Sequence, residues 1–203
     1  MRASLLFNAA RALREGRLGD AAVFKAVALT ATPFSQALRA VNALAEPLPE
    51  FSGLRTTATA EGTLGHAYAG FLSKHRIQPL SISARVRHEV APLNIVAARY
   101  VLVHDVFHVL LGFDISLPGE LAIWSFVAAQ RYSSTYGKAA ALARALYPIA
   151  QPSAYNELKR QRTQALALAE QCPCLIGQPL EQYWPRPLAE VRSQLGILEA
   201  HDA

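Results

Sequence analysis

The sequence predicts an all-α fold in a single domain. Three observations support this prediction: apolar residues recur at helical spacing, residues that begin or end helices separate those stretches, and strand patterns are nearly absent. Hydrophobic residues make up 52% of the 203 residues and charged residues 17%. Such a composition provides a large core and excludes disordered, coiled-coil and low-complexity classes. The length suits one helical bundle over residues 1–203.

The N-terminal part should form two helices. A first helix is expected within Met1–Arg17, where leucines and alanines repeat at helical spacing. The same stretch holds four arginines and one glutamate, as transit peptides do. Because no small-residue cleavage site follows, we interpret it as a helix. Asp20 should cap a second helix that runs through Leu29.

Two further helices should follow. Thr32 before Pro33 should begin one of them, and Pro47 should close it. After a loop, an amphipathic stripe begins behind Thr63. Its members are Leu64, Ala67, Tyr68, Phe71 and Leu72. Residues 76–88 should be irregular or briefly extended.

The most apolar helix should run from Pro92 to Leu111, with Gly112 as its C-cap. A short turn then leads to Glu120 and a second apolar helix, Leu121–Gln130, so the two should form a central hairpin. The remaining helices are expected at Lys138–Leu146, at Ser153–Glu170 and just after Pro187. Cys172 and Cys174 are too few for a disulfide framework and should be reduced thiols.

Three ionisable side chains interrupt the most apolar helix: His104, Asp105 and His108. At about 100° per residue the two histidines lie one turn apart on one face, with Asp105 at its edge. Burying these groups without partners would be costly, whereas a divalent cation would satisfy all three. Glu120, at the start of the facing helix, is the candidate fourth ligand. The sequence therefore predicts a metal site on the hairpin.

Nitrogen and oxygen ligands of this kind fit Zn²⁺ and leave Fe and Mn open, since no thiolate is present. Two histidines on an apolar helix can also be ordinary core residues with satisfied hydrogen bonds, and that alternative stays open. A zinc protease is not favoured, because such proteases place a glutamate beside the first histidine, where this chain has Asp105.

This cluster, HDxxH followed by eleven residues and a glutamate, resembles the zinc-site signature of the fourth coenzyme Q (ubiquinone) biosynthesis protein family. The likeness extends to the segment Glu61–Gly65 with Tyr68, to Arg99, and to Gly119 before the glutamate. It ends in a C-terminal pattern made of Trp184, Pro187, Leu188, Val191, Arg192, Leu195, Gly196 and Ile197. The resemblance covers about residues 18–197, with one departure: His66 stands where the family has arginine.

The resemblance implies an all-α fold, a zinc or similar ion, a groove for a polyprenyl quinone precursor, and peripheral attachment to a membrane. It also implies removal of the ring carboxylate from a prenylated hydroxybenzoate, with hydroxylation at the same carbon. The ion would be held by His104, Asp105, His108 and Glu120. The alternative is a non-catalytic, metal-stabilised lipid-binding scaffold that organises the other ubiquinone-biosynthesis proteins. The expected location is the cytoplasmic face of a bacterial inner membrane, or the matrix face in mitochondria, and the chain could form a homodimer.

Candidate substrate contacts flank the ligands on the two helices. They are Tyr100, Phe107, Leu111 and Trp124, with Ile123 and Val127 as further apolar neighbours. A prenyl tail needs a long apolar slot, and these side chains could line it or could be ordinary core. Arg99 falls on the opposite face of the helix from the histidines, so we expect it to form a structural ion pair or to meet a distant lipid headgroup.

Charge favours an anionic partner. Twenty basic residues against fifteen acidic ones give a net charge of +5. Nucleic acid is not expected, because no recognition motif is present. No membrane-spanning segment is expected either, since the longest uncharged run, Ala26–Leu38, is interrupted by Pro33 and is shorter than the roughly 20 residues that a span needs.

Overall fold

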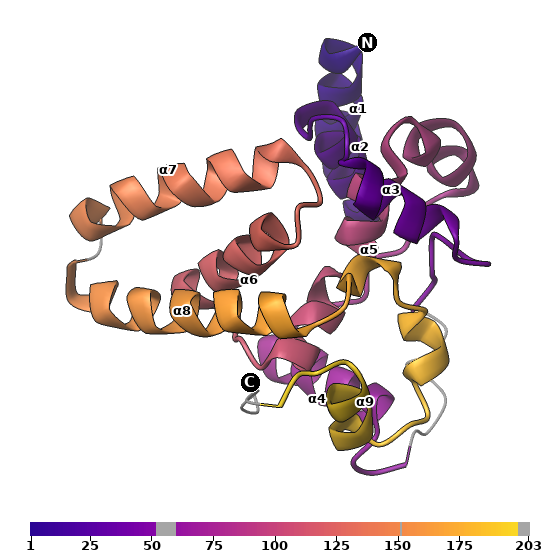
Figure 1. Cartoon of the computed structure of the whole chain (residues 1–203). Helices are drawn as coiled ribbons and strands as arrows, with labels where there is room; N and C mark the ends of the chain where they lie inside the picture. Colours follow the sequence, from indigo (N-terminus) through magenta and orange to yellow (C-terminus); the bar gives the residue numbers. More distant parts are fainter. Residues whose placement is uncertain (52–59, 151, 199–203) are drawn as a thin grey trace.

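The structure is a computed structural model that describes residues 1–51, 60–150 and 152–198, without the side chains of 148–150. Within these ranges the chain is helical and has no β-strand (Figure 1). The predicted all-α class is therefore confirmed. The α-helices are α1 (Arg2–Arg14), α2 (Leu18–Leu29), α3 (Ser35–Asn42), α4 (Leu64–His75), α5 (Ile95–Leu111), α6 (Leu117–Ala129), α7 (Ser134–Ala150), α8 (Tyr155–Gln171) and α9 (Leu188–Gln194).

Helix α5 lies at the centre of the packing. Asn94 caps its N-terminus by accepting a hydrogen bond from the backbone N–H of Ala97 at 3.2 Å. Gly112 ends it with a φ of 73°, as the sequence predicts. One face of α5 joins the main core cluster through Val103 and Leu110, and another joins a second cluster through Leu102. The helix is thus buried on nearly all sides, which explains its almost uniformly apolar sequence.

Helices α1 and α2 pack against each other and rise together from the body (Figure 1). Their shared core includes Leu5, Val23 and Phe24 and reaches Leu102 of α5. The prediction that Asp20 caps α2 is wrong, because α2 begins at Leu18. The carboxylate of Asp20 is instead buried and accepts a hydrogen bond from a distant backbone N–H, that of Ser83, at 2.8 Å.

The predicted start of α3 is also wrong. The helix begins at Ser35 and not directly after Thr32, and it ends at Asn42, before Pro47. Pro33 forms an isolated antiparallel bridge with Ser133, and the backbone N–H of Phe34 donates to the carbonyl of Tyr132 at 3.1 Å. This tertiary pairing holds the segment extended, so the helix cannot begin there.

Helices α6, α7 and α8 form an arm on one side of the molecule (Figure 1). Helix α6 packs against both α7 and α8. A small core cluster of Leu121, Tyr147 and Leu158, with Trp124 at its edge, joins the three helices. Helix α6 begins four residues earlier than predicted, because the Ser116 hydroxyl accepts a hydrogen bond from the N–H of Gly119 at 3.4 Å and caps it.

Helix α4 is tied to the C-terminal segment by backbone hydrogen bonds. Helix α4 begins directly after Thr63, as predicted, and Thr63 caps it by accepting from the N–H of His66 at 3.2 Å. The N–H of Leu64 donates to Arg186 at 2.9 Å, and the N–H of Leu188 donates to Gly62 at 2.9 Å. The segments that carry the first and last parts of the family likeness therefore lie side by side.

One continuous helical stretch, Val86–Leu111, is long and apolar enough to cross a membrane by length and composition, with a mean hydropathy of 1.3. It includes α5 and the π-helical and 3₁₀ turns before it. Inside the protein, 72% of its apolar window is buried. The central helix of a packed core has the same character, so this feature is weak evidence for a span.

Candidate metal centre

Three predicted ligands come together where α5 meets the first turn of α6. Nε2 of His104 lies 3.4 Å from Oε2 of Glu120, and Nε2 of His108 lies 3.4 Å from Oε1 of the same carboxylate. One ligand atom from each of the three residues falls within 4.8 Å of the others. Helical spacing presents the two imidazoles on one face, and the turn after α5 brings the carboxylate across to them.

The neighbours of His108 determine which of its ring nitrogens donates a hydrogen bond. His108 is fully buried, and its Nδ1 lies 2.9 Å from the carbonyl oxygen of Phe113. A carbonyl only accepts, so Nδ1 donates its hydrogen to Phe113 and Nε2 faces the carboxylate of Glu120. A lone pair facing a carboxylate is repulsive unless a proton or a cation lies between them. The ring is held there by stacking on Phe71, with centroids 5.6 Å apart.

Two glycines position Glu120. Gly112 takes the left-handed conformation that ends α5 and turns the chain. Gly119 packs so closely on the turn that a Cβ there would lie 2.0 Å from the carbonyl oxygen of Asp114. The side chain of Asp114 accepts from the N–H of Ser116 at 3.1 Å and stiffens the same turn. The first turn of α6 therefore lies close to the end of α5.

The charges of the cluster depend on one another. Burial disfavours the charged form of His104, but hydrogen bonds with Asp105 and Glu120 outweigh it and raise the pKa of His104 to about 9. Burial likewise opposes ionisation of Glu120, yet its interactions with His104 and His108 lower the pKa of Glu120 to about 2. At neutral pH the carboxylate is ionised and therefore able to bind a cation.

The donor set and its spacing fit a zinc ion. Bonds of about 2.0–2.2 Å in a tetrahedral site place neighbouring ligand atoms roughly 3.4 Å apart. The Nε2 atom of each histidine lies at this distance from an oxygen of Glu120, Oε2 for His104 and Oε1 for His108. The orphaned Nε2 of buried His108, which has no hydrogen bond of good geometry, gains a partner when a cation binds. Two imidazoles and a carboxylate also suit iron or manganese.

Asp105 lies behind the cluster. Its Oδ1 is 3.4 Å from Nδ1 of His104, on the side of the ring away from Glu120, and it is not one of the three residues whose ligand atoms gather. A carboxylate in this place accepts the Nδ1 hydrogen and leaves Nε2 free for a cation. The geometry therefore favours an orienting role for Asp105.

The predicted substrate contacts lie in different surroundings. The ring of Tyr100 meets that of His104 edge-on, with centroids 5.4 Å apart, and its buried hydroxyl has no hydrogen-bond partner among the described residues. Phe107 and Leu111 are fully buried in the main core, as are Ile123 and Val127. Trp124 packs in the arm beside Tyr147. Among these candidate substrate-binding residues, Tyr100 is thus the one that touches a candidate metal-binding residue, His104.

Two arginines serve the framework of the site. Arg99 is fully buried, and its Nε donates to the carbonyl of Ile176 at 2.7 Å. It also lies 3.8 Å from Glu181, so the expected structural ion pair is present, and burial lowers the pKa of Arg99 to about 10. Arg192 of α9 donates to the carbonyls of Leu110 at 3.0 Å and Val109 at 2.8 Å. It caps the end of α5, a role that sequence reasoning did not assign.

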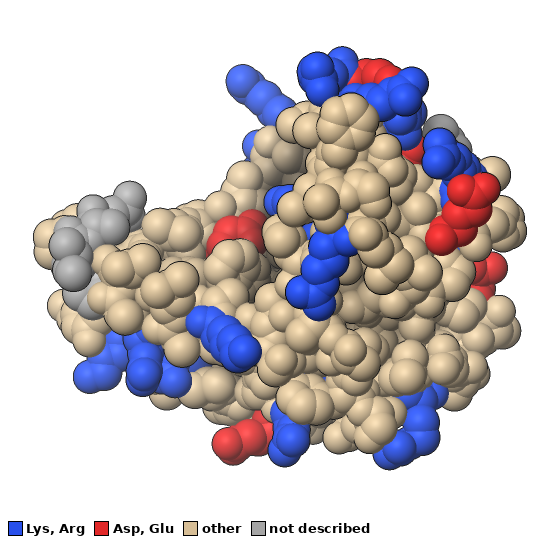
Figure 2. Space-filling model, turned by 90° about the horizontal axis from the view of Figure 1, so that it is seen from above, with Lys and Arg blue, Asp and Glu red and all other residues tan. Residues whose placement is uncertain are grey.

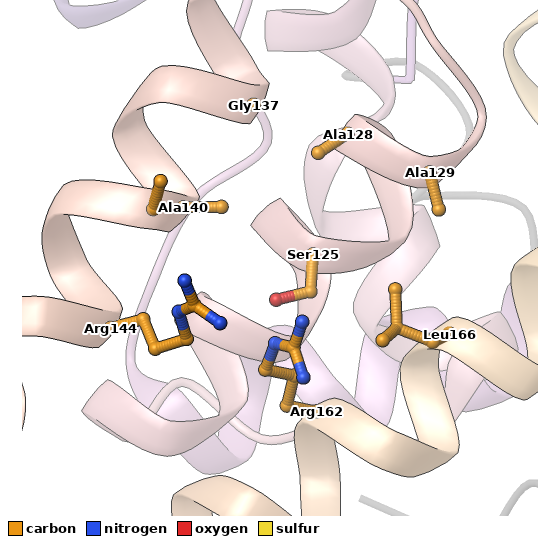
Figure 3. Close-up of a pocket in the computed structure, with 9 residues that line it drawn as sticks. Ser125, Ala128, Ala129, Gly137, Ala140, Arg144, Arg162 and Leu166 are labelled. Atoms are coloured by element: carbon orange, nitrogen blue, oxygen red, sulfur yellow. The ribbon is translucent and has the colours of Figure 1, made fainter.

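A separate cavity of about 220 Å³ lies between α6, α7 and α8. Arg144 of α7 and Arg162 of α8 point into it beside Ser125 of α6 (Figure 3). Its walls are otherwise small and apolar, as shown by Ala128 and Ala140. The three clustered ligands do not line this cavity, so it is distinct from the candidate metal centre.

The fold and the site together define a class: an all-α protein in which two histidines of one helix and a glutamate of the next could hold a metal ion. Comparison with known proteins narrows this class. The family described as coenzyme Q (ubiquinone) biosynthesis protein Coq4 matches residues 44–201. The chain therefore belongs to the Coq4 family, and the predicted family is confirmed. The match begins at residue 44, later than the motif likeness suggested.

Individual relatives agree with this assignment. A mitochondrial ubiquinone biosynthesis protein COQ4 homolog of Danio rerio is 33% identical over 146 residues, which is 70% of this chain and 52% of that protein. The Bos taurus homolog is 29% identical over 145 residues, 68% of this chain and 52% of that protein. The chain thus spans about half the length of the curated relatives it matches.

The crystal structure of a protein from Nostoc punctiforme has a similar fold. The TM-score is 0.62, and the match covers 97% of this chain and 96% of that one. The sequence identity is 21%, so this comparison supports the fold alone.

Proposed function

We propose that this chain acts in coenzyme Q biosynthesis on a polyprenylated hydroxybenzoate, at a divalent cation held by His104, His108 and Glu120. One observation carries the proposal. The Nε2 atoms of His104 and of buried His108 both face the carboxylate of Glu120, and each lies 3.4 Å from one of its oxygens. Zn²⁺ is the preferred ion, with Fe and Mn as the alternatives. Family membership supports the pathway, and the donor set supports the ion.

The proposed reaction removes the ring carboxylate and hydroxylates the same carbon. The bond from the ring to the carboxylate breaks, carbon dioxide leaves, and a ring–oxygen bond forms. The ring loses two electrons in this change, so an acceptor is required; with water and dioxygen the products are the phenol, carbon dioxide and hydrogen peroxide. A bound cation would supply Lewis-acid stabilisation of the negative charge that develops.

The chain's own residues would prepare this site. Asp105 holds the proton on Nδ1 of His104, and the carbonyl of Phe113 holds the proton on Nδ1 of His108, so both rings keep their Nε2 atoms toward the reacting region. The unpartnered hydroxyl of Tyr100 lies in the same region and could donate to a substrate oxygen. Phe107 and Leu111 would form the apolar background to the site, and Trp124 would lie farther along α6.

The proposal includes the expected surroundings of the protein. The partners would be the polyprenyl quinone precursor, other ubiquinone-biosynthesis proteins and a membrane surface, and a homodimer is compatible with these roles. The location would be the cytoplasmic face of a bacterial inner membrane or the matrix face in mitochondria. The curated relatives are named as mitochondrial proteins, which supports the second location for those relatives.

The test compares Glu120→Gln with a matched control, Glu170→Gln, which changes an exposed carboxylate at the end of α8. Purified variants are compared for metal per chain, helical content, binding of a prenylated hydroxybenzoate and product formation. We expect Glu120→Gln to fold and bind lipid but to lose most of its metal and its product. Glu170→Gln should match the unchanged protein.

Two results would contradict the proposal in different ways. Full metal occupancy in Glu120→Gln would remove Glu120 from the ligand set. A folded, metal-free Glu120→Gln variant that still supports ubiquinone production in a host lacking the wild-type protein would favour the non-catalytic lipid-binding scaffold.

A further inference from the structure

The outward face of α1 is apolar. Leu5 and Ala12 point inward and are buried, which fixes the rotation of the helix. At about 100° per residue, the arc on the outer side runs from Arg2 to Phe7 and contains Leu13, Leu6, Ala10 and Ala3, with Arg14 between Ala3 and Phe7. Phe7 is 64% exposed and Leu13 60% exposed. Large side chains exposed together on one face mark an interaction surface.

Helix α2 presents a second apolar strip beside the first. Most of its residues are buried against the body of the protein, and a solvent-facing strip on such a helix is ordinarily polar. On this strip Leu18 is 55% exposed and Leu29 is 56% exposed, with Ala22 between them. Lys25 is the charged residue of the strip.

The two strips meet along a shallow groove of about 380 Å³ between the helices. It is lined by apolar side chains from both helices and by Lys25. We call the exposed face of α1 and α2 that surrounds this groove, including Arg2, Arg14 and Lys25, the hairpin face. Figure 2 shows the molecule from above, where most of the visible surface is uncharged and basic side chains are interspersed with fewer acidic ones.

The basic residues of the hairpin face have no acidic partner among the described residues, whereas other basic residues of the same helices do. Arg11 and Arg17 both form ion pairs with Glu15. No carboxylate of the described chain lies within ion-pair distance of Arg2, Arg14 or Lys25. Their charge is therefore left for a partner.

We propose that the hairpin face docks on an anionic lipid bilayer, with Phe7, Leu13 and Leu18 entering the headgroup boundary and Arg2, Arg14 and Lys25 contacting lipid phosphates. Apolar side chains flanked by basic ones are the pattern of helices that lie in a membrane interface. A second copy of this chain fits less well, because a symmetric dimer through this face would bring like charges together. The inference rests on the proposed function insofar as a polyprenyl substrate resides in a membrane.

Vesicle binding tests the proposal with the full chain. The assay measures partitioning onto phosphatidylcholine vesicles in which about a third of the lipid is phosphatidylglycerol, and onto phosphatidylcholine alone. We expect binding to the anionic vesicles that weakens in high salt. Replacing Arg2, Arg14 and Lys25 by Gln should lower the partition coefficient by about a hundredfold, since each basic residue contributes about 1 kcal/mol, or about fivefold.

The apolar part is tested by Phe7→Ser with Leu13→Ser, and the matched control is Leu142→Ser with Leu146→Ser on α7. The control residues are 61% and 54% exposed and also lie on one helix face. We expect about a tenfold or greater loss for the hairpin pair and little change for the α7 pair. All four side chains are exposed, so the variants should fold, and circular dichroism checks this.

Equal losses for both pairs, or no loss for the hairpin pair, would overturn the proposal. So would a concentration-dependent dimer without vesicles that Phe7→Ser with Leu13→Ser dissociates, because the hairpin face would then cover a second copy. The hairpin face and the metal cluster share no residues, so the hairpin variants should keep their metal. Metal content measured on the same variants therefore separates a failure of this inference from a failure of the proposed function.

Discussion

Gly119 offers a sharp test of how the fold positions Glu120. A Cβ at this position would lie 2.0 Å from the carbonyl oxygen of Asp114 and 2.6 Å from its Oδ1. Carbon and oxygen atoms pack at about 3.4 Å or more, so Gly119→Ala must open this gap by more than about 1 Å. The backbone of the turn cannot yield as a flexible side chain would. Overpacking of this kind costs about 1–3 kcal/mol of folding free energy.

The same displacement would reach the metal centre, because Glu120 is the next residue. Metal–ligand distances tolerate deviations of only about 0.2 Å. We therefore expect Gly119→Ala to lower zinc affinity by about 10- to 100-fold, the size of effect that follows when a ligand loses its supporting contact. Competition titration against a chromophoric zinc chelator measures the affinity, and chemical denaturation measures the stability.

Gly70→Ala is the matched control. Gly70 lies within α4, and a Cβ there meets nothing within 4 Å. Because alanine favours a helix more than glycine does, stability should stay the same or rise by about 0.5–1 kcal/mol, with zinc affinity unchanged. If Gly119→Ala binds zinc as tightly as the unchanged protein, the close approach of α6 to the turn does not position Glu120, and the reasoning is refuted.

Two further predictions follow from named contacts. Arg192→Met should lose about 2 kcal/mol of stability, because it removes charged hydrogen bonds to the carbonyls of Leu110 and Val109, and urea denaturation would show it; an unchanged midpoint would contradict the capping role. With a pKa of about 9, His104 is charged at pH 7 and must lose its proton to bind a cation, so zinc binding should release about one proton from this residue, and affinity should rise with pH until about pH 9. Calorimetric titrations in two buffers of different ionisation enthalpy would measure the release, and equal apparent enthalpies would contradict it.

The helices that were predicted well are those defined by local signals. Helix α4 begins directly after Thr63 and Gly112 ends α5, as expected, because both signals act within a few residues of chain. Both cysteines, Cys172 and Cys174, are free, which also agrees with the prediction. The predictions for Asp20 and Thr32 failed because distant segments compete for the same groups. The carboxylate of Asp20 accepts a hydrogen bond from the backbone N–H of Ser83, and the backbone after Thr32 pairs with residues 132–133.

The candidate site was predicted in part for the same reason. The spacing of His104 and His108 guarantees that the two imidazoles share a helix face, and Glu120 was found because a short turn leads to it. The Phe113 carbonyl that sets the tautomer of His108 could not be read from the sequence, since backbone atoms leave no residue-specific signal. The sequence shows that residue 119 is a glycine, but it does not show that this residue packs closely against Asp114.

The sequence alone determined the helical class, the pair of histidines one turn apart and the likeness to the Coq4 family, because helical periodicity and motif spacing are local properties of the chain. Tertiary structure alone decided that Glu120 lies 3.4 Å from both imidazoles, that Arg99 is buried among the carbonyls of distant segments, and that an apolar face of α1 remains exposed. These features depend on how helices far apart in the chain pack against one another. Packing is set by shape and burial over the whole molecule, and no short window of sequence contains that information.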